Sequence, residues 1–203
     1  MMKSKYQNEK RSLNFNIRAD ETQESGNRLI GTPIVFGSRT TLCQDWNGNN
    51  IDEIIESTAL DGADLSDVRF LVNHDTSQLP LARYVQGAEN NTMTLSIDSN
   101  GVNIVVDLDV ENSQRAKDLY SAVARGDVTG MSFMFDVSEW NEEHEENGTR
   151  LNRVTKISKV YEVSAVTFPA YEDTSIEARS KYTKPHIMSV ETLKLKCKIL
   201  GGF

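Results

Sequence analysis

The chain has 203 residues, of which 38% are hydrophobic and 26% are charged, a balance typical of a soluble globular protein. This length suits one domain with a tail or two and is enough to bury a sizeable core. No apolar run approaches the roughly 20 residues that a membrane helix requires, so we expect no membrane association. The N-terminus is basic but lacks the apolar segment of a secretory signal, which predicts cytoplasmic synthesis.

Charge is unevenly distributed, although the net charge is only −8. Residues 1–18 contain five Lys or Arg and one Glu, and residues 179–203 contain six and one. The body between them therefore has 11 basic and 28 acidic residues, a net charge of −17. Nucleic-acid binding requires a basic face, so this acidic body argues against it. The basic ends are either solvated tails or arms that lie on the acidic body.

The segment 1–27 is polar and lacks a sustained period, which predicts a mobile N-terminal arm. A strand is expected at 28–37, which is rich in β-branched and apolar residues and is interrupted by Gly and Pro, and the fold should begin there. After a turn around Asn47 and Gly48, residues 51–60 should start as a strand and end in a short helical turn. A loop then leads to a strand at 68–75.

A β-meander is predicted next, with strands at 79–88, 92–98 and 102–110 separated by turn residues. One amphipathic helix should follow within 112–127. Its apolar stripe contains Ala116, Leu119, Tyr120 and Val123, Asn112 or Ser113 can cap its start, and Gly126 follows its last turn.

The pattern over 129–140 alternates again and predicts a strand. The acidic run 142–146 is expected to be a solvated loop, and 150–168 to be a hairpin return plus one more long strand. The periodicity decays after Pro169. We therefore expect a folded domain over 28–178 and a basic tail over 179–203.

Three residues in strand-like segments could act together as a base, a nucleophile and an acid: His74, Ser132 and Glu162. A free Ser hydroxyl is a weak nucleophile, so a serine hydrolase needs all three. His74 could equally be a structural histidine at a strand end. His144 lies in a polar segment and His186 in the basic tail, so both compete poorly for the role of base.

Ser132 follows Gly130, which leaves room for an acyl substrate beside the hydroxyl. If Met131 and Phe133 face the core, alternation turns Ser132 outward, where a nucleophile must be.

Glu162 interrupts an apolar strand and on alternation shares a face with Val160 and Ser164, so it should be partly buried. A buried carboxylate needs a partner. His74 is one candidate partner, and a salt bridge to Lys159 or Arg83 is the other.

Other chemistry has little support in the sequence. Cys43 and Cys197 have no metal-ligand spacing and are expected to be two free thiols. The acidic run around His144 lacks the second histidine of a zinc motif, so we expect no metal. There is no glycine-rich phosphate loop, and we expect no cofactor.

Several segments together closely resemble the bacteriophage prohead maturation protease family, from Arg28 to Arg179. They are GTPIVFG (31–37), the pair His74-Asp75, LARY (81–84), the helix end at 124–126, GMSFMF (130–135) and YEVSAVTFPAY (161–171). In one place the chain departs from the usual pattern, with Leu81-Ala82 where many members have Ile-Gly.

The resemblance implies a mainly β fold like that of herpesvirus proteases, an antiparallel β-barrel with flanking helices. It assigns the base to His74, the nucleophile to Ser132 and the third role to Glu162. Asp75 competes for the third role, but as the direct neighbour of His74 it would usually point to the other strand face. The oxyanion would be bound by backbone amides near 150–153 or around 130–133.

The resemblance also implies a biological role. The protein would be made in the host cytoplasm and packaged inside the procapsid. There it would cleave the scaffolding segment of the major capsid protein and itself, with 179–203 as a candidate region for self-cleavage. Self-association is a further expectation.

Two alternatives remain open. One is a catalytically silent module on the same fold that binds scaffold or capsid protein through its charged surfaces. The other is a small-substrate esterase or amidase, which would be expected to carry the G-x-S-x-G motif that this chain lacks.

Overall fold

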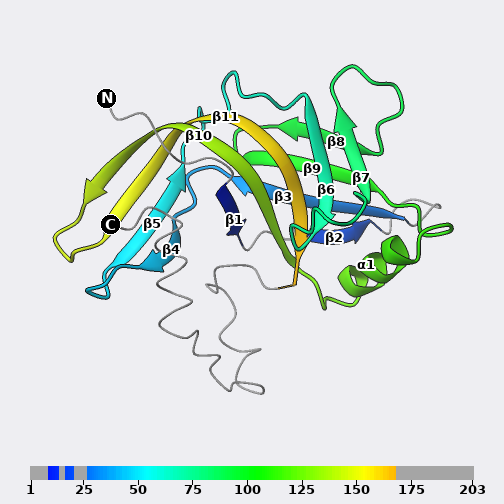
Figure 1. Cartoon of the computed structure of the whole chain (residues 1–203), viewed down its shortest axis with the longest axis horizontal. Coiled ribbons are helices and arrows are strands. Elements are labelled where there is room, and N and C mark those ends of the chain that lie inside the picture. The colour runs from blue at the N-terminus through cyan, green and yellow to red at the C-terminus, as the bar shows by residue number, and fades with distance from the viewer. Residues whose placement is uncertain (1–8, 14–16, 21–26, 168–203) are drawn as a thin grey trace.

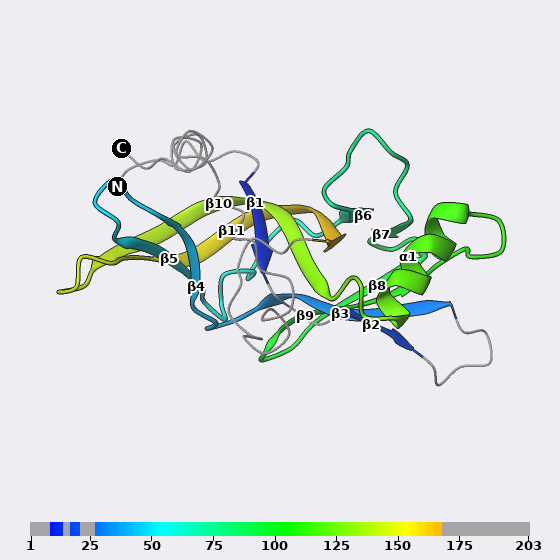
Figure 2. The same ribbon diagram turned by 90° about the horizontal axis from the view of Figure 1, so that it is seen from below.

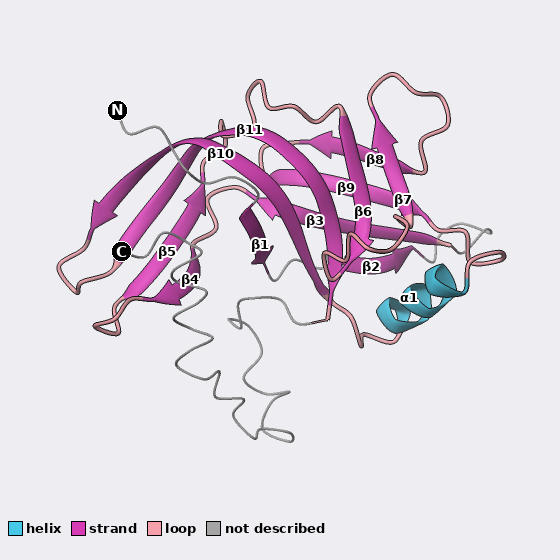
Figure 3. Ribbon diagram, in the orientation of Figure 1, coloured by secondary structure: helices cyan, strands magenta, loops and turns pink. Residues whose placement is uncertain are grey.

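The computed structural model describes residues 9–13, 17–20 and 27–167 of the 203-residue chain. These ranges contain 11 strands and one helix (Figure 1), and the prediction of a mainly β fold is confirmed (Figure 3). In chain order the elements are β1 (Glu9–Leu13), β2 (Ile17–Asp20), β3 (Arg28–Val35), β4 (Thr40–Gln44), β5 (Asn50–Ile55), β6 (Asp67–Val72), β7 (Ala82–Val85), β8 (Met93–Ile97), β9 (Gly101–Asp107), α1 (Gln114–Ala124), β10 (Gly130–His144) and β11 (Arg150–Val166).

The described strands form a seven-stranded and a four-stranded sheet. In the larger sheet the order is β1, β10, β11, β5, β4, and β6 pairs with both β11 and β7. The first part of β11 pairs in parallel with β5, and its last part pairs in parallel with β6. The smaller sheet has the order β2, β3, β9, β8 and is antiparallel throughout. The expected antiparallel arrangement thus holds at every strand pairing except the two parallel ones of β11.

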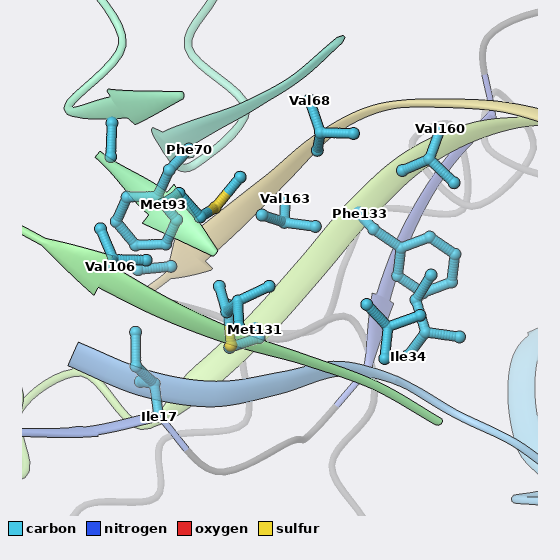
Figure 4. Packing of buried hydrophobic residues seen from close by; sticks show 14 of the residues in the cluster. Ile17, Ile34, Val68, Phe70, Met93, Val106, Met131, Phe133, Val160 and Val163 are labelled. Atoms are coloured by element: carbon cyan, nitrogen blue, oxygen red, sulfur yellow. The ribbon is translucent and has the colours of Figure 1, made fainter. Parts of the chain in front are cut away.

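The two sheets face each other, and the main hydrophobic core lies between them (Figure 2). Alternation along the strands supplies this core, because every second side chain points to the same side of a sheet. Figure 4 shows side chains of both sheets meeting there. The larger sheet contributes Val68, Phe70, Met131, Phe133, Val160 and Val163, and the smaller sheet contributes Ile17, Ile34, Met93 and Val106.

Neither sheet closes into a ring among the described strands. Where a barrel was expected, these strands form two sheets that face each other. One helix, α1, lies beside them within the described residues (Figure 1). Ser113 caps this helix, accepting a hydrogen bond from the amide of Ala116 at 3.3 Å, and Gly126 follows its end with φ 79°. The likeness to the herpesvirus protease fold stays a prediction.

Further segments differ from their sequence-based expectations. The segment 1–27, expected to be a mobile arm, contains β1 and β2, which pair with β10 and β3. The acidic run 142–146 is only partly a loop, because β10 continues to His144. The segment expected to be a hairpin return plus one long strand is instead the single 17-residue strand β11. The domain boundary at 178 and the basic tail fall outside the described residues and stay predictions.

Candidate active site

Ser132 lies in β10 on the sheet face opposite the main core. Its neighbours Met131 and Phe133 both belong to that core, as alternation predicts. Across the antiparallel ladder Ser132 is paired with Ser164 of β11. The predicted face is therefore correct, but the expected exposure is not, since Ser132 is 0% exposed.

A β-bulge in β11 sets the direction of Glu162. Met134 is paired with Glu162 and Phe135 with Val160, so Tyr161 has no counterpart on β10. An extra residue reverses the alternation of the side chains beyond it. Val160 and Val163 accordingly both lie in the core. The expectation that Glu162 shares the face of Val160 is therefore wrong.

The same bulge places Glu162 and Ser164 on the sheet face of Ser132, because partners in an antiparallel ladder point to the same side. Both side chains are buried, with exposures of 2% for Glu162 and 0% for Ser164.

A left-handed turn after β6 brings His74 back over this face. β6 runs parallel to β11, with Leu71 beside Ser164, and ends at Val72. Asn73 and His74 then have φ angles of 53° and 58°, a left-handed backbone conformation that residues other than Gly seldom adopt.

Asn73 is held in this turn by contacts with the end of β11. Its amide donates to the carbonyl of Ala165 at 2.9 Å. Its side chain accepts from the amide of Thr167 at 2.8 Å and donates to the Thr167 hydroxyl at 3.1 Å. These bonds offset the cost of the left-handed backbone, which is of order 1–3 kcal/mol per residue.

His74, Glu162 and Ser164 are joined by hydrogen bonds. Nδ1 of His74 is hydrogen-bonded to Oε1 of Glu162. The Ser164 hydroxyl donates to Oε2 of Glu162 at 2.5 Å and accepts from the amide of His74 at 3.2 Å. An ionised carboxylate only accepts, so the proton of a neutral His74 lies on Nδ1, and Nε2 has a free lone pair. This arrangement suits a general base.

The other partners considered for these residues are engaged elsewhere. Lys159 contacts Asp64 at 2.7 Å, and Arg83 contacts Asp67 at 2.8 Å, so neither provides a salt bridge to Glu162. Asp75 accepts from the amide and the hydroxyl of Ser77, at 3.0 and 2.5 Å. Glu162 is therefore the carboxylate in contact with His74.

The structure thus brings two of the three predicted residues into direct contact and places the third on the adjacent strand. Ser132 is linked to the pair through its register with Ser164. Sequence reasoning did not single out Ser164 or Asn73. The one available signal for Ser164 was its position two residues after Glu162, since i and i+2 share a face of a strand.

One suggested location of the oxyanion site does not fit. Residues 150–154 occupy the part of β11 that pairs with β5, at the far end of the strand from Glu162. At about 3.3 Å per residue, the nine steps from residue 153 to residue 162 correspond to roughly 30 Å along the strand. Amides at 150–153 are therefore excluded, whereas those around 130–133 lie beside the site.

The acidic run near the β10–β11 turn is organised by arginines. Arg153 contacts Glu143 at 2.7 Å, and Arg39 contacts Glu145 at 2.7 Å. His144 contacts Glu142 at 3.0 Å and its side chain is 67% exposed, whereas His186 lies outside the described residues. Within the described ranges no group of three or more His, Cys, Asp or Glu side chains is arranged to hold a metal ion. No helix in the described part of the chain has the length and apolar character to span a membrane.

A mainly β fold with a serine, a histidine and a buried glutamate on one sheet face defines the class of candidate serine hydrolases. A comparison with protein-family models matches residues 13–188 to the caudovirus prohead serine protease family. The chain belongs to this family, and the resemblance found in the sequence is confirmed. Comparisons with curated proteins and with solved structures find no match. Membership supports a serine-protease role in phage head maturation and implies a capsid-protein substrate in general.

Proposed function

We propose that this protein is a serine endopeptidase of head maturation that cleaves the scaffolding segment of the major capsid protein, and itself, inside the procapsid. It would be made in the host cytoplasm and packaged by association with capsid protein. The observation that carries the proposal is the hydrogen bond between His74 and Glu162 on the sheet face that also holds Ser132.

In the proposed mechanism Oγ of Ser132 attacks the carbonyl carbon of the scissile peptide, and its proton passes to Nε2 of His74. Glu162 stabilises the resulting imidazolium through Nδ1. His74 then transfers the proton to the leaving amine as the C–N bond breaks. Water reverses these steps: it gives one proton to His74, its oxygen bonds to the acyl carbon, and Ser132 leaves with the proton restored.

The burial of Ser132 adds a requirement to this mechanism. A hydroxyl that is 0% exposed cannot meet a peptide carbonyl until the groups covering it move apart. We therefore propose that the described conformation is a dormant one and that substrate engagement opens the site.

The decisive experiment is intact-mass spectrometry over time on the purified chain and on Ser132→Ala, each incubated with the cognate capsid protein. Discrete fragments are expected from the parent and none from Ser132→Ala. Ser138→Ala is a matched control, because Ser138 lies on the same strand, is exposed, and donates its hydroxyl hydrogen bond to the backbone carbonyl of Lys156 at 3.2 Å. Equal cleavage by Ser132→Ala and the parent would exclude this nucleophile.

The alternative is a catalytically silent module that binds scaffold or capsid protein. The full burial of Ser132 is the observation that favours it. A fluorophosphonate probe separates the two functions: covalent labelling of Ser132 in the presence of capsid protein supports the protease. Capsid binding without labelling or cleavage supports the silent module.

A further inference from the structure

Ser164 has a role in the site that the three-residue mechanism does not include. We propose that Ser164 is a positioning residue that holds both the main chain and the imidazole of His74 in the orientation needed for proton transfer. This inference rests on the proposed function. Its chemistry is that of a buried hydroxyl that bridges an acid and a base without touching the substrate.

The first support is the direction of the hydrogen bonds. The amide of His74 can only donate and an ionised carboxylate can only accept. The Ser164 hydroxyl must therefore accept from His74 and donate to Glu162, as their distances of 3.2 and 2.5 Å allow. The orientation of this hydroxyl is thus fixed by its neighbours rather than by solvent, from which Ser164 is fully shielded.

The second support is that these contacts close a ring. One Glu162 oxygen bonds the imidazole of His74, the other accepts from Ser164, and Ser164 accepts from the main chain of His74. Both carboxylate oxygens are occupied, so the carboxylate plane is restrained against rotation. The ring joins the side chain of His74 to its own backbone through Glu162 and Ser164, and it thereby sets the direction of Nε2 of His74.

The third support is the backbone of His74. Its φ of 58° is an uncommon conformation that needs support from its surroundings. The bond to Ser164 attaches this residue to β11, and the pairing of Ser164 with Ser132 attaches the same point to the strand of the nucleophile. Ser164 is therefore placed to control the geometry between base and nucleophile.

The activity arm of the test compares Ser164→Ala, Ser164→Cys and Ser158→Ala. Ser158 is a matched control, since it lies on β11, is exposed, and donates to the carbonyl of Asp136 at 3.3 Å outside the ring. We expect Ser164→Ala to lower kcat by about 10- to 100-fold with KM changed less than about twofold, because misorientation affects chemistry more than binding. The weakly donating thiol of Ser164→Cys should restore part of kcat, and Ser158→Ala should match the parent.

The second arm needs no turnover. In a Ser132→Ala background, ¹⁵N NMR of His74 reports which imidazole nitrogen carries the proton. A single Nδ1–H tautomer is expected with Ser164 present, and a tautomer mixture or exchange broadening is expected in Ser164→Ala.

The kinetic and the NMR measurements together distinguish a failure of the positioning role from a failure of the proposed protease function. Parent kcat together with an unchanged tautomer in Ser164→Ala would overturn the positioning role. A parent chain without any cleavage, but with a tautomer that responds to Ser164, would overturn the protease function alone. If Ser164→Ala fails to fold, Ser164→Cys decides by the same two readouts.

Discussion

Glu162 is the residue whose role is most open to a direct mutational test. It contacts His74, while Asp75, the competing acid, accepts from Ser77. We expect Glu162→Gln to lower kcat by at least about 100-fold, because an amide can also stabilise the wrong imidazole tautomer and cannot balance the imidazolium charge. Steady-state kinetics on a capsid-derived peptide measures the effect.

The matched control is Asp75→Asn, which keeps the oxygen that accepts from Ser77. Activity within about threefold of the parent is expected from this variant. The opposite result, with Asp75→Asn inactive and Glu162→Gln active, would move the third role to Asp75.

At the residue scale the sequence predicted the pairing of His74 with Glu162 but not how it is made. Strict alternation cannot reveal the extra residue Tyr161, and it therefore assigned Glu162 to the wrong neighbours. It also cannot reveal the left-handed backbone at Asn73 and His74, because that conformation depends on bonds to Ala165 and Thr167, about 90 residues away.

Among the elements, β9 approaches β3 so closely that there is no space for a side chain at Gly101. A Cβ added at Gly101 would lie 1.9 Å from the carbonyl oxygen of Ile34, which is backbone and cannot rotate away. We expect Gly101→Ala to lower the free energy of unfolding by about 3 kcal/mol, since β3 or β9 would have to shift. Urea denaturation followed by fluorescence measures this change.

Gly87→Ala provides the control for that substitution. Gly87 also has a positive φ, +78°, but an added Cβ would meet nothing within 4 Å. The expected loss is therefore only the backbone strain, about 1 kcal/mol. Equal losses for the two variants would show that steric contact at Gly101 is not limiting.

The elements with clear periodicity were predicted well, and those that depend on distant partners were not. The buried stripes of α1 and β9 are local patterns, so the sequence contains them. β1 and β2 are short and polar, and they exist through pairing with β10 and β3. The parallel pairing of β6 with β11 brings together segments about 90 residues apart, which no local pattern encodes.

At the scale of the whole molecule, surface hydrogen bonds couple stability to pH. They hold the pKa values of several carboxyl groups in the folded protein below their ordinary values. At a pH between the folded-state and the unfolded-state pKa, the unfolded chain therefore binds more protons than the folded protein does. The groups and their main partners are Asp45 with the Asn49 amide, Asp64 with Lys159, Asp67 with Arg83, Asp98 with the Asn100 amide, and Glu145 with Arg39.

Their stabilisation is fully present above the unfolded-state pKa of about 4 and is lost as pH falls toward the folded-state values. We expect the urea midpoint to decrease between pH 5 and pH 3 at about 0.15 M salt, where repulsion between distant charges is largely screened. Asp64→Asn should reduce this pH dependence because it removes one coupled group. A urea midpoint that stays constant or rises on acidification would show that these carboxyl groups do not stabilise the folded protein in this way.

β11 also determines when the site can first exist during synthesis. It is the last described strand of the chain, yet it supplies Glu162 and Ser164 and pairs with β5, β6 and β10. His74 and Glu162 are 88 residues apart, which at about 5–20 residues per second corresponds to roughly 4–18 seconds of translation. A nascent chain therefore contains the proposed base and nucleophile before the strand that orients them, and the proposed site cannot assemble until the chain has been made as far as the end of β11 at Val166.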